Sequence, residues 1–208
     1  GFVTAALAKS AQLPFTPWIT RALEGPTPSS AVFYGAVMVH AGVYLLIRCE
    51  PLLLQVPDMM AAVALAGAAT AIYAWLCGRV QTDVKTALLY ATVSHVGLMV
   101  LACGLGWFGL ASTYLALHAL WRGYQFLLAP SYLLLAPSRP APLPRWLSGN
   151  SALYTAALQR FWIDRVAHGL LTRPTLSLGR DVREFDARVL DRLVGVSHEI
   201  SGDRAGMI

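Results

Sequence analysis

Charged residues are scarce in this sequence. Asp, Glu, Lys and Arg make up 13% of the 208 residues, whereas hydrophobic residues make up 56%, and the mean hydropathy is +0.55. Soluble domains carry about 25% charged residues, so the composition excludes an ordinary water-soluble domain and predicts a membrane protein. Most of the charged residues follow residue 135, and we therefore expect the membrane part to end near Leu135.

Motifs for metals, cofactors and nucleic acids are also missing. Cys49, Cys77 and Cys103 lie far apart without a CxxC pair, so we expect no metal site. The sequence has no dinucleotide, Walker or haem-attachment motif, and we expect no cofactor. The net charge of +5 is spread over loops and a mixed-charge tail, which argues against a nucleic-acid partner. With no signal peptide at its start, the chain is expected to begin partway through a longer protein.

The first 135 residues contain apolar runs of about 20 residues, the length that crosses a bilayer core of about 30 Å. We predict an all-α fold, a polytopic transmembrane helix bundle with broken helices. A partial span over 1–13 is broken at Pro14 and followed by an irregular loop. Thr27 as N-cap and Pro28 start the next helix. The four full spans are 27–48, 57–79, 84–106 and 108–129.

The rest of the chain divides into a Pro-rich linker over 136–149 and an amphipathic helical tail over 150–208. We expect one helix with an apolar face that includes Leu158, Phe161 and Trp162. A second helix after Pro174 has apolar residues at helical spacing, namely Val182, Phe185, Val189, Leu193, Val196 and Ile200. The tail can lie on a membrane surface or on partner helices. The alternative is an ordinary packed cytoplasmic helix pair.

Basic residues are distributed unevenly between the two ends of the predicted spans. Arg48 stands alone at one end, and the other end has Arg21, Arg79, Lys85, Arg139 and Arg145. Cytoplasmic loops carry the excess of Lys and Arg in membrane proteins. We therefore predict a cytoplasmic tail.

Three histidines, His40, His95 and His118, fall near the midpoints of their predicted spans. Ionisable residues inside a bilayer are costly and indicate function, and histidine can accept and release a proton near neutral pH. We predict a lateral proton relay. The alternative is that each histidine simply forms a hydrogen bond with a neighbouring helix.

Other polar residues accompany these histidines. Arg122 lies one helical turn after His118, with Tyr114 and Gln125 nearby. Lys9 lies in the partial span and is the best candidate for a cation that releases its proton, unless it reaches to the membrane interface. The remaining charges have structural interpretations: Glu24 pairs with Arg21, while Asp83 and Lys85 flank a helix start.

Several segments together resemble one family, the antiporter-like membrane subunits of respiratory complex I. The resemblance is closest to the subunit L or chain 5 type of NADH-quinone oxidoreductase and to Mrp-type sodium/proton antiporters. The segments are 8–15, 24–31, 38–46, 81–85 and 90–97, and the resemblance covers 1–135. It implies that the front half of the protein is absent, that the partners are other membrane subunits and the lipid bilayer, and that the location is a bacterial inner membrane.

The resemblance also assigns roles to single residues. Lys9 matches a lysine on a broken helix and His118 a histidine on the second broken helix, both in the family's proposed proton path. Tyr34 and Tyr114 stand where the family has histidines, and Arg122 stands where it has a lysine. Because a guanidinium does not release its proton, Arg122 implies a divergent or specialised member.

The resemblance implies a subunit that translocates protons or another cation. The expected path contains Lys9, His40, His95, His118 and Arg122, and the supporting residues are Glu24, Tyr34, Asp83, Lys85, Tyr114 and Gln125. One alternative is a structural subunit without pumping, in which Arg122 anchors an interface. Another is the membrane subunit of an ion-coupled complex for inorganic-carbon uptake. Redox chemistry is expected to belong to partner chains.

Overall fold

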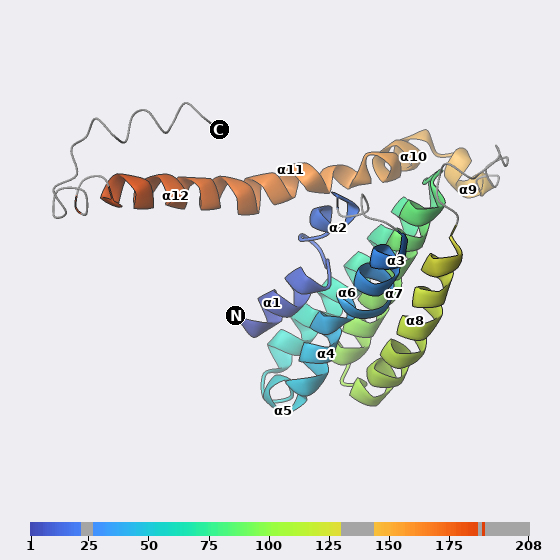
Figure 1. Ribbon diagram of the computed structural model, residues 1–208, viewed down its shortest axis with the longest axis horizontal. Coiled ribbons are helices and arrows are strands. Elements are labelled where there is room, and N and C mark those ends of the chain that lie inside the picture. Colours follow the sequence, from blue (N-terminus) through green and yellow to red (C-terminus); the bar gives the residue numbers. More distant parts are fainter. Residues whose placement is uncertain (22–26, 130–143, 187–188, 190–208) are drawn as a thin grey trace. The chain divides into compact units, whose positions relative to one another are not determined.

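The computed structural model describes residues 1–21, 27–129, 144–186 and 189 (Figure 1). All regular elements in these ranges are helical, which confirms the predicted all-α class. The chain divides into two compact units, Gly1–Asp164 and Arg165–Ile208, which are described separately. In the first unit, helices α1, α4, α6, α7 and α8 form a bundle (Figure 1).

The first helix is shorter than the sequence predicts. Helix α1 (Phe2–Lys9) ends four residues before the predicted end at residue 13, because Ala11 adopts φ 52°. The segment predicted as an irregular loop contains a short helix, α2 (Pro17–Arg21), with proline in its first position, where the missing N–H costs nothing. Between these helices, the Leu13 N–H donates to Thr70 Oγ at 3.0 Å. This bond from α6 satisfies a backbone donor that non-helical structure leaves unpaired.

The next span begins where the sequence places it. Helices α3 (Thr27–Ser30), η1 (Ala31–Val37) and α4 (His40–Arg48) follow one another in one helical run, of which Pro28–Arg48 is long and apolar enough to cross a membrane. The η1 segment is a π-helix. This form is rare in proteins, and where it occurs it often lies at a functional site. A short helix, α5 (Glu50–Leu53), follows.

Helices α6 (Pro57–Arg79) and α7 (Val84–Gly104) pack against each other through small residues. A Cβ atom built on Gly97 would lie 2.8 Å from the Ala71 nitrogen and 2.8 Å from the Gly67 oxygen. The Ser94 hydroxyl also donates to the Ala71 carbonyl at 2.9 Å. Small residues that let two backbones approach closely are typical of helix pairs in membranes.

Helix α8 (Phe108–Leu128) has the predicted position and is 21 residues long. Pro28–Arg48, Pro57–Arg79 and Val84–Gly104 are the three described helices with the length and composition of membrane spans. Helix α8, which contains His118, Arg122 and Gln125, is not among them. A fourth full span at 108–129 therefore stays a prediction.

The start of the predicted tail packs on the bundle. Helix α9 (Arg145–Ser148) occupies the end of the predicted linker, whose residues 136–143 lie outside the described residues, and α10 (Ser151–Leu158) follows. The Trp146 ring stacks on Trp75 of α6, with centroids 5.5 Å apart, and the Arg79 guanidinium lies 5.3 Å from the Trp75 centroid. The first compact unit accordingly extends beyond the linker to Asp164.

The first amphipathic helix of the tail is broken, which corrects the prediction of one continuous helix. Arg160, Phe161 and Trp162 have positive φ and form the turn η3 (Arg160–Trp162), after which α11 (Ile163–Ala167) begins. The turn lets the Phe161 ring pack edge-on against Tyr73 of α6, at 6.0 Å between centroids. The packing of the Phe161 ring on the bundle therefore interrupts the tail helix and the continuous apolar face predicted for it.

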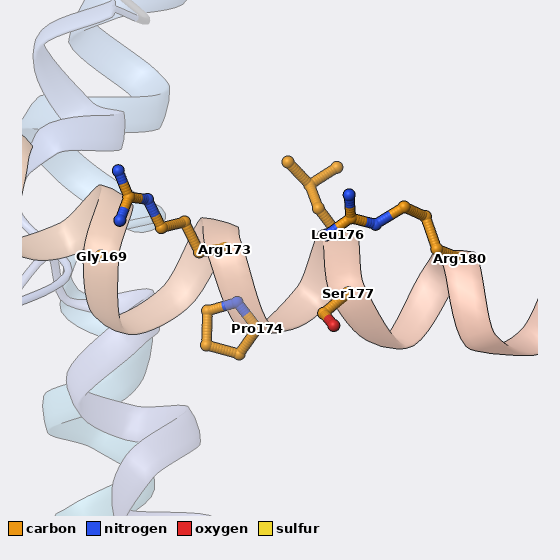
Figure 2. A pocket seen from close by; sticks show the side chains of 6 residues that line it. All are labelled: Gly169, Arg173, Pro174, Leu176, Ser177 and Arg180. Atoms are coloured by element: carbon orange, nitrogen blue, oxygen red, sulfur yellow. The ribbon is translucent and has the colours of Figure 1, made fainter.

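The second unit contains η4 (His168–Thr172) and α12 (Arg173–Phe185). The helix predicted after Pro174 therefore begins one residue before that proline. Val182, Phe185 and Val189 are exposed, whereas Leu193, Val196 and Ile200 lie outside the described residues. A shallow hollow runs along this one helical segment, and Figure 2 shows the side chains that line it. Its lining residues are all exposed: Gly169, Arg173, Pro174, Leu176, Ser177 and Arg180.

Candidate functional site

Three histidines from three helices meet inside the bundle. His40 of α4 and His118 of α8 are 3% and 5% exposed, and His95 of α7 is half-buried. The His40 Nε2 and His118 Nδ1 atoms are 2.9 Å apart, a hydrogen-bond distance. The His95 ring lies 5.0 Å from the His118 ring, measured between centroids. The structure thus brings together the three residues that the sequence places near mid-depth, and we call them the histidine cluster.

Helix α8 supplies three polar residues to this region, because residues four apart share one helix face. Tyr114, His118 and Arg122 follow one another at this spacing. The Tyr114 hydroxyl lies 2.8 Å from His95 Nδ1, and the Tyr114 ring meets the His118 ring edge-on at 5.8 Å. Tyr114 therefore touches two members of the histidine cluster.

The hydrogen bond between His40 and His118 is suited to proton exchange. In a neutral imidazole one ring nitrogen donates and the other accepts, so either histidine can act as the donor in this pair. Each ring has a second nitrogen, His40 Nδ1 and His118 Nε2, that is buried without a hydrogen-bond partner in the part of the chain that the structure describes. Each histidine therefore has one nitrogen engaged in the pair and a second that is available to bind a proton or another group.

Arg122 adds a permanent positive charge beside the histidine cluster. Its side chain is 5% exposed, and its Nη1 donates to Gln125 Oε1 at 2.9 Å. Its Nε is buried without a hydrogen-bond partner among the described residues. Within those same ranges, no carboxylate forms an ion pair with Arg122. The guanidinium is thus held by a neutral amide, a weak partner for a buried charge.

The structure describes four of the other predicted site residues, namely Lys9, Tyr34, Asp83 and Lys85. Lys9 is the exposed last residue of α1, and Tyr34 of η1 is half-buried against the core. Asp83 caps α7, where its Oδ2 accepts hydrogen bonds of 2.7 Å from the Thr86 N–H and from the Thr86 hydroxyl. Lys85 is the second residue of α7, and Glu24 lies outside the described residues.

Two structural features are absent from the sequence predictions. The π-helix η1 ends just before His40, and Gly35 in η1 packs so closely on α8 that a Cβ would lie 3.3 Å from the Arg122 carbonyl oxygen. The break after α1 also buries polar atoms without described partners: Ser10 Oγ, Gln12 Oε1 and Thr16 Oγ1. The sequence signal for these buried polar atoms is the presence of Ser10, Gln12 and Thr16 close to Pro14 in an otherwise apolar run.

The geometry of these residues does not form a metal site. In the ranges that the structure covers, no group of three His, Cys, Asp or Glu side chains is arranged to hold a metal ion. The three histidines instead bond to one another and to Tyr114.

Comparison with known proteins places most of the chain in one family. Residues 1–136 match the family described as NADH:quinone oxidoreductase/Mrp antiporter, transmembrane. The chain is 41% identical over 128 residues to NADH-ubiquinone oxidoreductase chain 5 of Schizophyllum commune, covering 62% of this chain and 19% of that protein. It is 44% identical over 122 residues to NADH-quinone oxidoreductase subunit L of Pseudomonas aeruginosa, covering 59% and 20%. For the Escherichia coli subunit L, the identity is 42% over 129 residues, covering 62% and 21%. The chain spans about a fifth of the length of these relatives.

Proposed function

The chain belongs to the NADH:quinone oxidoreductase/Mrp antiporter transmembrane family, and we propose that it is part of a membrane subunit that conducts protons through the histidine cluster. The matched residues 1–136 include His40, His95 and His118. The observation that carries the proposal is the 2.9 Å contact between His40 Nε2 and His118 Nδ1. It joins two helices by a bond that can exchange a proton in either direction.

The proposed transfer uses one proton at each step. His40 first takes up a proton at Nδ1, so that its ring carries a proton on each nitrogen. The Nε2 proton then moves to His118 Nδ1, which leaves His40 neutral with its proton on Nδ1. His118 releases its Nε2 proton in turn and returns to the neutral form as the opposite tautomer. The His95 ring of α7 lies 5.0 Å from the His118 ring, measured between centroids, and extends the path to a third helix. The Tyr114 hydroxyl, which is bonded to His95, extends it further. Imidazole and phenol groups can each accept one proton while releasing another.

The remaining parts of the proposal rest on the family and on the sequence. Lys9 serves as a separate proton-binding station at the broken helix, supported by its match to a family lysine. The moving ion is a proton or another cation. The partners are other membrane subunits, because the relatives are named as subunits or chains of NADH-quinone or NADH-ubiquinone oxidoreductases. The location is a bacterial inner membrane. The tail lies on its cytoplasmic side, which the distribution of basic residues favours.

One observation favours a second candidate function, a structural subunit of the same kind of complex that does not pump. Arg122 is buried and cannot release its proton. In this alternative its charge holds an interface, and the histidines serve as hydrogen-bonding links between helices. The two functions predict different proton conductance.

Proton flux into proteoliposomes tests the choice. The full-length protein with its co-purifying partners is compared with His40→Gln and His118→Gln under an imposed membrane potential. Glutamine keeps a hydrogen-bonding amide but does not titrate. His168→Gln is the matched control, because His168 is exposed and lies in the second unit.

The conducting subunit predicts flux in the wild type and in His168→Gln, and flux at the level of protein-free vesicles in the other two variants. The structural subunit predicts that the wild type gives no flux. Equal flux in all four proteins would also contradict the histidine path.

A further inference from the structure

Among the described residues, the surroundings of the histidine cluster contain basic side chains but no carboxylate. His40, His95, His118 and Arg122 lie on three helices that pack together. The ionisable groups that contact them in the described ranges are Tyr114 and the histidines themselves. Arg122 carries its charge at all physiological pH values. The region therefore holds a positive charge that no described residue neutralises.

Hydrogen-bond donors also exceed acceptors here. A guanidinium has five N–H donors and no acceptor, and the one described acceptor for Arg122 is the Gln125 amide oxygen. Arg122 Nε is a buried donor without a partner. His118 Nε2, one turn earlier on α8, is also buried and unpartnered, and it is a donor when His118 Nδ1 accepts from His40. Buried charges in proteins are normally paired and fully hydrogen-bonded. The missing chemical group at this point is an acceptor that carries negative charge.

We propose that Arg122 binds an anionic group on the α8 face that it shares with His118. The group is small and singly charged, because the site offers one permanent positive charge and is more than nine-tenths buried at both residues. A halide or a carboxylate has this chemistry, and a carboxylate also matches the planar guanidinium. The source is either a dissolved anion or an acidic side chain from another chain or another part of the full-length protein.

Such an anion changes what the histidine cluster can do. With Arg122 unpaired, a proton on His118 raises the local charge from +1 to +2 in a region shielded from water. With the anion bound, the same proton raises it from 0 to +1, which costs less because like charges repel strongly at low dielectric constant. The anion would therefore promote protonation of the cluster. This consequence rests on the proposed function, whereas the binding itself does not.

Thermal unfolding of the full-length protein with its partners tests the binding without measuring flux. Sodium chloride and sodium formate are compared with sodium gluconate at equal ionic strength, since gluconate is too large for a buried site. A ligand that binds only the folded state raises the melting temperature in a saturable way. Arg122→Gln removes the charge, Arg122→Lys keeps it, and Arg48→Gln is the control at an exposed arginine of α4.

A saturable rise with chloride or formate in the wild type and Arg48→Gln, but not in Arg122→Gln, identifies a dissolved anion. A carboxylate side chain predicts no dependence on the added anion. In that case Arg122→Gln melts below Arg48→Gln, and Arg122→Lys restores most of the loss.

The proposal is overturned if added anions have no effect and Arg122→Gln is as stable as Arg48→Gln, because removing a paired buried charge must destabilise. It is also overturned if added anions have no effect and the glutamine and lysine variants lose equal stability, which indicates a packing role. If Arg122→Gln does not accumulate, Arg122→Lys takes its place. A melting temperature that still rises with the added anion, in a weaker but saturable way, supports a dissolved anion, and a melting temperature near that of the wild type without anion dependence supports a carboxylate. A clearly lower melting temperature without anion dependence overturns the proposal. Anion binding without proton flux would leave this inference standing and remove the proposed function.

Discussion

The contact between α6 and α7 leads to a quantitative prediction about Gly97. In Gly97→Ala the new methyl group would lie 2.8 Å from two backbone atoms of α6, the Ala71 nitrogen and the Gly67 oxygen. Backbone atoms cannot rotate away as a side chain can, so the two helices have to move apart. Gly109 provides the opposite case, because it is exposed in α8 and a Cβ there meets no atom within 4 Å.

The expected magnitudes follow from two opposing effects. Alanine is favoured over glycine in a helix interior by about 1 kcal/mol, and by less in the first turn, where Gly109 lies. Overpacking a well-packed contact costs about 1–3 kcal/mol, and it acts on Gly97 alone. We therefore expect Gly109→Ala to change the free energy of unfolding by about 0 to +1 kcal/mol. If the gain in the first turn is about half of that in the interior, Gly97→Ala should be about 0.5–2.5 kcal/mol less stable than Gly109→Ala.

Both variants are made in the full-length protein, and their unfolding is measured under the same conditions in the same detergent. The comparison of two glycine-to-alanine changes removes most of the effect of helix propensity and leaves the steric cost. A Gly97→Ala protein that is as stable as Gly109→Ala would refute the close approach of α6 and α7.

Two further predictions concern single hydrogen bonds. Tyr114→Phe removes the hydroxyl bonded to His95. It should lower proton flux in proteoliposomes and reduce the free energy of unfolding by only about 0.5–1.5 kcal/mol. Unchanged flux would exclude Tyr114 from the path. Thr70→Val removes the acceptor of the Leu13 N–H and should destabilise the protein by about 1–3 kcal/mol, the usual cost of a buried donor without an acceptor. Thr113→Val, at an exposed threonine that bonds within its own helix, is its control in unfolding measurements, and equal losses would show that the Leu13 bond is unimportant.

Most helix positions follow from the sequence because they depend on local properties. The second span starts within one residue of Thr27, and α6 has the predicted bounds at Pro57 and Arg79. Apolar runs set their length, while prolines and capping residues mark their ends. The prediction fails where tertiary contacts decide, as at the early end of α1 and at the turn around Phe161, whose ring packs on the bundle.

The sequence by itself determined that this chain is a helical membrane protein, because hydrophobicity is a property of each run alone, and it predicted histidines near the midpoints of three runs. It also carried the resemblance to the family that residues 1–136 match. Only the tertiary structure decided which polar groups touch. The bond between His40 and His118 and the isolation of the Arg122 charge depend on how each helix is rotated and how closely it packs. Rotation and distance are set by contacts between residues far apart in sequence, such as those around Gly97 and Gly35, which no local pattern records.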